Sequence, residues 1–283
     1  MLCYSFRYVL VLAACQALPL ISLEQSNEVE DATLIDLTEL GIEMFGRPDE
    51  VLTAARVANY NADSDAVNPE ELGSYLEGDI LVPNITMKNG LIAQSSRWPY
   101  GVVPCEIRGN FTRAELQILQ YAIEQYHTRT CIRFVPYTGQ TDYISIVSGN
   151  SGCWSSVGRV GGKQEVNLQS PGCLRRPGTA IHELMHALGF LHEQNRQERD
   201  DYVAIQYQNI RTAHVKNFRK ASRTEAFGVP YDYGSVMHYS GNAFSNNGEA
   251  TIVPRQTNLG VRMGQRKGFS NLDIIKLNRM YDC

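Results

Sequence analysis

The sequence lacks any run of about 18 apolar residues, which excludes a transmembrane helix. It also lacks internal repeats and low-complexity segments. Charged residues make up 20% of the 283 residues and hydrophobic residues 43%, proportions that exclude wholesale disorder and are ordinary for a globular protein. The length is sufficient for one large domain or two modest ones.

Basic side chains are scarce in the first part of the chain. Residues 18–88 carry a net charge of −12, whereas residues 89–283 carry a net charge of +7. Such an asymmetry indicates two segments with different roles. Nucleic-acid binding by the second segment is an alternative. However, its 22 basic residues form no run, so we interpret them as a solvated surface and expect no nucleic-acid partner.

The N-terminus has the pattern of a secretory signal peptide. Arg7 precedes the apolar run Tyr8–Ala14, and the small residues Cys15 and Ala17 stand at positions −3 and −1 of a cleavage site after residue 17. A buried N-terminal strand or helix is the alternative. We expect residues 1–17 to be removed and the remainder to be secreted into an oxidising extracellular environment, without stable membrane association.

The acidic segment 18–88 has few aromatic residues and lacks the material for a core of its own, although it suffices for a helix or two. Pro83–Gly90 has the composition of an exposed loop, and Lys88 within it is a site for a trypsin-like protease. An ordinary interdomain linker explains this stretch equally well.

From Trp98 onward the pattern changes to strands and helices. Strands are expected at Gly101–Ile107, Cys131–Val135, Tyr143–Val147 and Glu165–Leu168. Thr112 and Glu115 form a capping box that begins a helix with the apolar face Leu116, Leu119, Ala122, Ile123 and Tyr126. A second helix begins near Thr179, and the chain after it is irregular. This order of elements predicts an α+β domain.

Two histidines of the second helix have the spacing of a metal site. His182 and His186 are four positions apart, so both imidazoles point to the same side of an α-helix and can bind one Zn²⁺. A face for the core is formed by Ile181, Leu184, Met185 and Leu188. Three unrelated histidines are a poor explanation, because three of the chain's six histidines fall in one pattern that includes His192.

Gly189 gives His192 access to the same metal. In a continuous helix, His192 would lie about 15 Å further along the axis than His182. Glycine adopts a positive φ, which ends the helix and lets the chain turn back to present a third ligand. Three protein ligands leave one position for water, as in a catalytic zinc site, whereas a structural zinc site would need a fourth protein ligand.

Glu183 follows the first of these histidines and need not bind the metal. Zinc lowers the pKa of its bound water from 15.7 to roughly 7, and a neighbouring carboxylate can take the proton as the water attacks a peptide carbonyl. A surface salt bridge is the alternative role for this side chain. We predict Glu183 as the general base of a peptide-hydrolysing enzyme.

The segment His182–Glu193 (HELMHALGFLHE), together with Ser235–Tyr239 (SVMHY), resembles the metzincins and, within them, the astacin family of zinc metalloproteases. The resemblance extends from about Asn89 to Cys283 and includes Gly152–Ser155. It implies an α+β fold of two subdomains: a twisted, mostly parallel sheet with two long helices above an active-site cleft, and an irregular C-terminal subdomain below it. It further implies one Zn²⁺ per chain, bound by His182, His186, His192 and Tyr239.

The resemblance assigns roles to other residues. Tyr239 is expected as a zinc ligand and catalytic residue that moves away to stabilise the oxyanion, Met237 as the floor of the site, and Glu193 as the residue that binds the new N-terminus. Core packing is the alternative role for Tyr239 and Met237. An edge strand near Gly162–Leu168 is expected to bind extended substrate by strand addition. A preference for acidic residues after the scissile bond is expected from Arg262, Arg266 and Lys267.

The resemblance also implies that residues 18–88 are a propeptide. Leu76-Glu77-Gly78-Asp79 is similar to the family's F-x-G-D motif, with leucine in place of phenylalanine, so Asp79 is expected to bind zinc in the zymogen. Cleavage between Lys88 and Asn89 by a trypsin-like protease would leave residues 89–283 as the catalytic domain. We therefore expect the simple form of these enzymes: signal peptide, propeptide and catalytic domain.

The five cysteines after residue 17 are expected to form two disulfides and leave one thiol. The resemblance pairs Cys131 with Cys283 and Cys153 with Cys173. It leaves Cys105 as a buried thiol or an intermolecular link. Two sequons predict glycosylation at Asn84 and Asn110.

We therefore predict a secreted, monomeric zinc endopeptidase made as a zymogen, whose partners are protein or peptide substrates and an activating protease. The alternative is a secreted protein that binds its partner on a protease scaffold without cleaving it. Glu183 favours the enzyme, because a scaffold that no longer cleaves would be expected to lose the base or a ligand.

Overall fold

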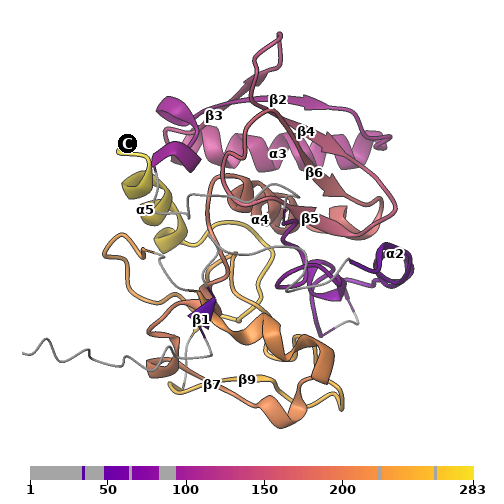
Figure 1. The fold of residues 1–283 in the computed structure, drawn as a ribbon, viewed down its shortest axis with the longest axis vertical. Coiled ribbons are helices and arrows are strands. Elements are labelled where there is room, and N and C mark those ends of the chain that lie inside the picture. The colour runs from indigo at the N-terminus through magenta and orange to yellow at the C-terminus, as the bar shows by residue number, and fades with distance from the viewer. Residues whose placement is uncertain (1–33, 36–47, 64–65, 83–93, 222–224, 258–259) are drawn as a thin grey trace, which may run out of the picture. The chain divides into compact units, whose positions relative to one another are not determined.

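The computed structural model describes residues 34–35, 48–63, 66–82, 94–221, 225–257 and 260–283 (Figure 1). They all belong to one unit, residues 32–283. The predicted signal peptide lies outside the described residues, as do Asn84, Lys88 and Asn89.

A five-stranded sheet forms the first half of this unit. Its strands are β2 (Val102–Ile107), β3 (Arg133–Pro136), β4 (Tyr143–Val147), β5 (Cys153–Ser155) and β6 (Lys163–Leu168), in the order β3-β2-β4-β6-β5. All neighbouring strands are parallel except β5 and β6, which are antiparallel. The four predicted strands are confirmed, with ends that differ by one or two residues.

The prediction of the edge strand is wrong. β6 lies between β4 and β5, so the edge on this side of the sheet is β5. A strand of three residues, all of them buried, gives no alternation of polar and apolar side chains, so the sequence offered no signal for it.

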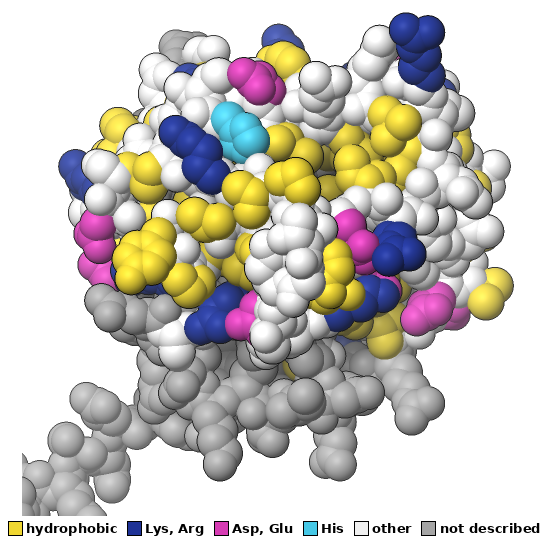
Figure 2. Space-filling view, turned by 90° about the horizontal axis from the view of Figure 1, so that it is seen from above, with side chains coloured by type: hydrophobic (Ala, Val, Ile, Leu, Met, Phe, Trp, Pro, Cys, Tyr) yellow, Lys and Arg dark blue, Asp and Glu magenta, His cyan; other side chains and the backbone are white. Residues whose placement is uncertain are grey.

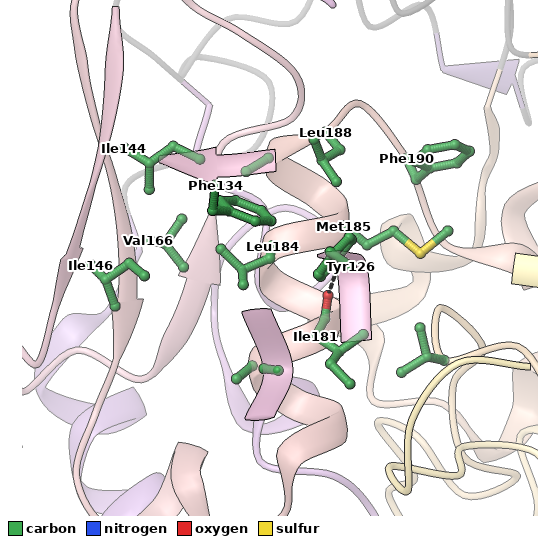
Figure 3. Close-up of a cluster of buried hydrophobic side chains, with 14 of the residues drawn as sticks. Tyr126, Phe134, Ile144, Ile146, Val166, Ile181, Leu184, Met185, Leu188 and Phe190 are labelled. Carbon is green, nitrogen blue, oxygen red and sulfur yellow. Dashed lines mark hydrogen bonds between the residues drawn. The ribbon is translucent and has the colours of Figure 1, made fainter. Parts of the chain in front are cut away.

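The first long helix, α3 (Arg113–Arg129), begins as predicted. Thr112 Oγ1 accepts the N–H of Glu115 at 3.3 Å, and the Glu115 carboxylate accepts the N–H of Thr112 at 2.7 Å. Leu119 and Tyr126 are fully buried, whereas Leu116 is 41% exposed. The helix packs against α4 (Pro177–Ala187), where the Tyr126 hydroxyl donates to the carbonyl of Ile181 at 2.7 Å (Figure 3).

α4 is buried on every side, from Gly178 to Ala187. Its apolar residues Ile181, Leu184 and Met185 belong to the main core with residues of β3 and β6, as predicted (Figure 3). On another side, a Cβ at Gly178 would lie 2.2 Å from the carbonyl carbon of Arg266, so glycine lets the two backbones touch. The helix that carries the metal-site pattern is therefore held rigidly.

The rest of the unit has short elements. β8 (Lys220–Ala221) pairs in parallel with β1 (Leu34–Ile35), and β7 (Val203–Ile205) pairs with β9 (Ile252–Pro254). The acidic segment contains α2 (Glu50–Ala58), in line with the helix or two expected there. The chain ends with α5 (Asn271–Met280), which was not predicted although Ser270 and Asp273 form a capping box. Apart from α5, the described part of the second half is irregular, as expected.

Both predicted disulfides are present, Cys131–Cys283 and Cys153–Cys173. Cys105 is free, and burial raises the pKa of its thiol to about 11. On the face seen in Figure 2, acidic and basic side chains are interspersed among hydrophobic ones, and neither sign of charge covers the face. Within the described part of the chain, no helix is long and apolar enough to cross a membrane.

Candidate active site

Three imidazoles and one carboxylate meet at a buried point. His182 and His186 come from α4, His192 from the segment after it, and Asp79 from the acidic segment. One atom of each lies within 4.8 Å of the others. Asp79 Oδ2 is 3.1 Å from His182 Nε2 and 3.3 Å from His192 Nε2, and Asp79 Oδ1 is 3.5 Å from His186 Nε2. The structure thus brings the three predicted histidines and Asp79 together.

Gly189 forms the predicted turn. Its φ is +110°, and its N–H donates to the carbonyl of His186 at 2.8 Å, which ends the helix. The next residue, Phe190, accepts a hydrogen bond from His186 Nδ1 at 2.7 Å. The turn therefore brings His192 back to the centre and also holds the ring of His186.

The Nδ1 atoms of the imidazoles fix the ring orientations. His182 Nδ1 lies 2.7 Å from the Val236 carbonyl, and His192 Nδ1 lies 2.6 Å from the Glu77 carboxylate. Because a carbonyl oxygen only accepts, Nδ1 of His182 and His186 carries the proton, and Nε2 directs a lone pair to the centre. Lone pairs that face a carboxylate repel it unless a cation lies between them. This donor set fits Zn²⁺.

Charge in the centre follows from burial and from the neighbours. Burial lowers the pKa of His182 to about 4. Although burial opposes it, the Asp79 and Glu77 carboxylates raise the pKa of His192 to about 9. Burial also opposes ionisation of Asp79, but the surrounding imidazoles hold its pKa well below its ordinary value. Asp79 is therefore ionised, and the imidazoles around it stabilise its negative charge.

Glu183 is buried, and neither carboxylate oxygen has a hydrogen-bond partner among the described residues. Burial raises its pKa well above the ordinary value, and the charges of Asp79 and Glu70 raise it further. A surface salt bridge is therefore ruled out as its role. A buried carboxyl group without a partner is costly, and carboxyls of this kind concentrate at functional sites.

Tyr239 and Met237 are both buried, and Tyr239 lies next to His192. The rings of Tyr239 and His192 have centroids 4.5 Å apart, and the Tyr239 hydroxyl donates to the Glu77 carbonyl. Met237 is 1% exposed and belongs to the main core, so its role as the floor of the site stays a prediction. In this form of the protein, the Tyr239 hydroxyl is thus engaged with the acidic segment.

The acidic segment covers the site by joining the sheet edge. The Leu81 N–H donates to the Ser155 carbonyl, and the Ser155 N–H donates to the Asp79 carbonyl, both at 2.9 Å. Ile80 is paired in parallel with Ser155. The acidic segment is therefore added to β5, whereas the addition of substrate was predicted at the strand near Gly162–Leu168.

Two supporting carboxylates were missed from the sequence. Asp273 of α5 accepts hydrogen bonds from Ser235 Oγ at 2.6 Å and Val236 N–H at 2.9 Å, while the carbonyl of Val236 holds His182. The capping box of Ser270 and Asp273 could have predicted α5. Nothing in the sequence indicated that Asp273 also binds Ser235 and Val236. Glu77 was part of the motif around Asp79 without a predicted role.

Glu193 is at the centre of a buried ion network. Lys276 Nζ lies 2.5 Å from one carboxylate oxygen, and Arg196 Nη1 and the N–H of Asp232 lie 2.8 and 2.9 Å from the other. Burial opposes its ionisation, but Lys276 and Arg196 lower its pKa. Asn110 is exposed, as a glycosylation site requires.

Residues 90–282 match the family model described as Astacin, a peptidase family. The chain is 43% identical over 210 residues to meprin A subunit beta from Homo sapiens, covering 73% of this chain and 29% of that protein. It is 39% identical over 225 residues to zinc metalloproteinase nas-4 from Caenorhabditis elegans, covering 75% and 70%.

A solved structure is also similar. High choriolytic enzyme 1, a hatching enzyme zinc-protease from Oryzias latipes, is 42% identical with a TM-score of 0.60, covering 68% of this chain and 92% of that chain. By contrast, the chain spans 29% of the length of meprin A subunit beta and 47% of zinc metalloproteinase nas-8 from Steinernema carpocapsae.

Proposed function

Because this chain belongs to the astacin family of peptidases, we propose that it is a secreted zinc endopeptidase made as a zymogen. The observation that carries the proposal is the arrangement on and after α4. The imidazoles of His182, His186 and His192 converge on one point, and the carboxyl group of Glu183 is buried nearby without a partner among the described residues.

The three imidazoles would hold Zn²⁺, with Asp79 as a further ligand in this form. The bound metal would supply Lewis-acid chemistry, which acidifies water and polarises a peptide carbonyl. The groups that hold Nδ1, above all the carbonyls of Val236 and Phe190, keep the Nε2 lone pairs aimed without rearrangement during the reaction.

Glu183 acts as the general base. Its carboxylate takes the proton of the water that attacks the scissile carbonyl and then passes it to the leaving amine. Neither carboxylate oxygen has a hydrogen-bond partner among the described residues, so both are available to a water molecule. α4 holds Glu183 in place because that helix is packed on all sides.

Tyr239 would complete the site once the acidic segment leaves. Its hydroxyl now donates to the Glu77 carbonyl, and removal of that carbonyl frees the donor. A phenol beside the reacting carbonyl can donate to the oxyanion of the tetrahedral intermediate, or approach the metal between turnovers as a further ligand.

Residues 18–88 are the propeptide in this proposal, and residues 1–17 are the signal peptide. Asp79 would block the metal position, and the pairing of Ile80 with Ser155 of β5 would exclude a substrate from that strand. Cleavage between Lys88 and Asn89 by a trypsin-like protease would free residues 89–283. Glu193 would then receive the new α-amino group, since a cavity of about 90 Å³ lies beside it.

Hydrolysis of casein before and after limited trypsin treatment tests the proposal. Activity is expected only after cleavage near Lys88, and it should vanish with a chelator or in Glu183→Gln. Glu124→Gln, which removes an exposed carboxylate on α3, is the matched control and should leave activity unchanged. Zinc-loaded, correctly cleaved protein that cleaves neither casein nor a peptide library would favour a binding protein instead.

A further inference from the structure

A second buried charge cluster joins the acidic segment to the rest of the unit. Glu70 is fully buried, and Arg266 is 1% exposed. The Arg266 Nε–H donates to Glu70 Oε1, and the Thr179 hydroxyl donates to Glu70 Oε2 at 3.3 Å. None of these side chains is one of the four metal-site residues.

The neighbouring Glu71 is bound in the same place by other donors. Ser240 donates to it twice, through its N–H at 2.7 Å and its hydroxyl at 2.5 Å. Asn68 donates to it through its N–H at 3.1 Å and its side-chain amide at 3.0 Å. The Asn68 amide also donates to the carbonyl of Gly264 at 3.1 Å, which closes the cluster.

The receiving side of this cluster is rigid. The carbonyl of Arg266 accepts the Gly178 N–H at 3.0 Å, and the two backbones touch there. Arg266 Nη1 donates to the His238 carbonyl at 3.2 Å, and Nη2 has no partner among the described residues. The guanidinium cannot follow a departing carboxylate, so loss of Glu70 removes the direct ion-pair partner of a buried charge.

The cavity next to Arg266 is lined mainly by basic side chains. A cavity of about 830 Å³ lies between the two parts of the chain, and Asn68 lines it from the acidic segment. From the other side its charged lining residues are five basic ones, Arg129, Arg176, Arg262, Arg266 and Lys267, and one acidic one, Asp232. This agrees with the net charges of −12 and +7 of the two segments.

We propose that Arg266, Ser240 and Thr179 form a carboxylate-binding site whose ligand is the Glu70-Glu71 pair of the acidic segment. The site anchors that segment independently of Asp79, so the segment stays bound after its connection to residues 89–283 is cut. The inference rests on the proposed zymogen, because it concerns how the blocking segment is held.

The test measures how tightly the cut segment remains bound. The full chain, in a Glu183→Gln background that prevents self-digestion, is cut with trypsin after Lys88, and the cut is verified by mass spectrometry. Size-exclusion chromatography over a dilution series then gives the Kd of the retained segment. Glu70→Gln and Glu71→Gln are compared with Glu50→Gln, an exposed carboxylate of the same segment. Residues 89–283 are identical in all three.

We expect Glu70→Gln to raise the Kd about 30-fold or more, and Glu71→Gln about tenfold, because each leaves buried polar groups unpaired. Glu50→Gln should stay within about threefold of the unmodified segment. Values within about threefold for both buried variants would overturn the anchor, as would a segment that is not retained at about 100 µM. If Glu70→Gln does not fold, Glu71→Gln decides, because its donors are different.

The proposed zymogen is tested by casein hydrolysis and not by the Kd of the segment. If the uncut chain without the Glu183 substitution hydrolyses casein as fast as the cut chain, the segment is not inhibitory, whatever its Kd. Conversely, the uncut chain could be inactive on casein while Glu70→Gln and Glu71→Gln leave the Kd unchanged. That result would support the zymogen and contradict the proposed carboxylate-binding site.

Discussion

Asp273 links the last helix to the metal site, so its removal should lower both the stability of the fold and the affinity for zinc. Asp273→Ala deletes the acceptor of three hydrogen bonds, from Ser235 Oγ, Val236 N–H and Ser270 N–H. Two of these donors are backbone groups that lose their partner, at about 1–3 kcal/mol each. The bond from the Ser270 N–H is also half of the capping box of α5, so these values already include the weakened cap. The sum is roughly 4 kcal/mol, an upper value because burial raises the pKa of Asp273 and thus disfavours its charge.

For a domain of this size, about 4 kcal/mol lowers the melting temperature by roughly 8–16 °C. Scanning calorimetry of the cut, zinc-loaded protein measures it, with the exposed Asp201→Ala as a control expected to shift it by about 2 °C at most. Zinc affinity should fall about 10- to 100-fold as well, because the Val236 carbonyl that orients His182 is no longer fixed. A decrease below about 3 °C together with unchanged zinc affinity would refute the reasoning.

Gly189→Ala puts a side chain at a φ of +110°, and it is expected to lower zinc affinity at least about tenfold in a chelator competition assay, since His192 loses its position. Tyr239→Phe in the cut enzyme should lower kcat about 100-fold with little change in KM, measured on a fluorogenic peptide, and an unchanged kcat would remove the oxyanion role. The lowered pKa of Glu193 means that its ion pairs stabilise the fold above its ordinary pKa of 4.5 and are lost as the pH falls through the lower folded-state pKa. Below pH 4.5 the melting temperature should therefore decrease more steeply in the unmodified protein than in Glu193→Gln, and equal slopes would contradict this.

Features that depend on nearby residues were predictable from the sequence. The start of α3 follows from a capping box within four residues, and the aim of His182 and His186 follows from helical periodicity. The turn at Gly189 follows from the need to bring His192 back, and its φ confirms it. These features rest on backbone geometry over one or two helical turns, which spacing alone determines.

Features that depend on distant residues were not predictable. Asp273 and Val236 are 37 positions apart, and Glu70 and Arg266 are 196 positions apart. A buried carboxylate looks like a surface carboxylate until its partner is known, because composition and periodicity do not say what covers it. The misplaced edge strand has the same origin, since strand order is set by pairing across the sheet and β5 is too short to be recognised.

The Cys131–Cys283 disulfide divides the chain into a part that can be released and a part that cannot. Its two ends are 152 positions apart, so all three metal-site histidines and Glu183 lie inside one covalent ring. A protease that cuts within the ring opens it but sheds nothing, and the damage becomes visible on a gel only after reduction. Residues 18–88 contain no cysteine, so after a cut behind them only noncovalent contacts retain them. Hydrolysis of one bond inside the ring therefore adds a single water to the mass of the protein, whereas after hydrolysis behind Lys88 the Kd of the severed segment alone decides whether it stays.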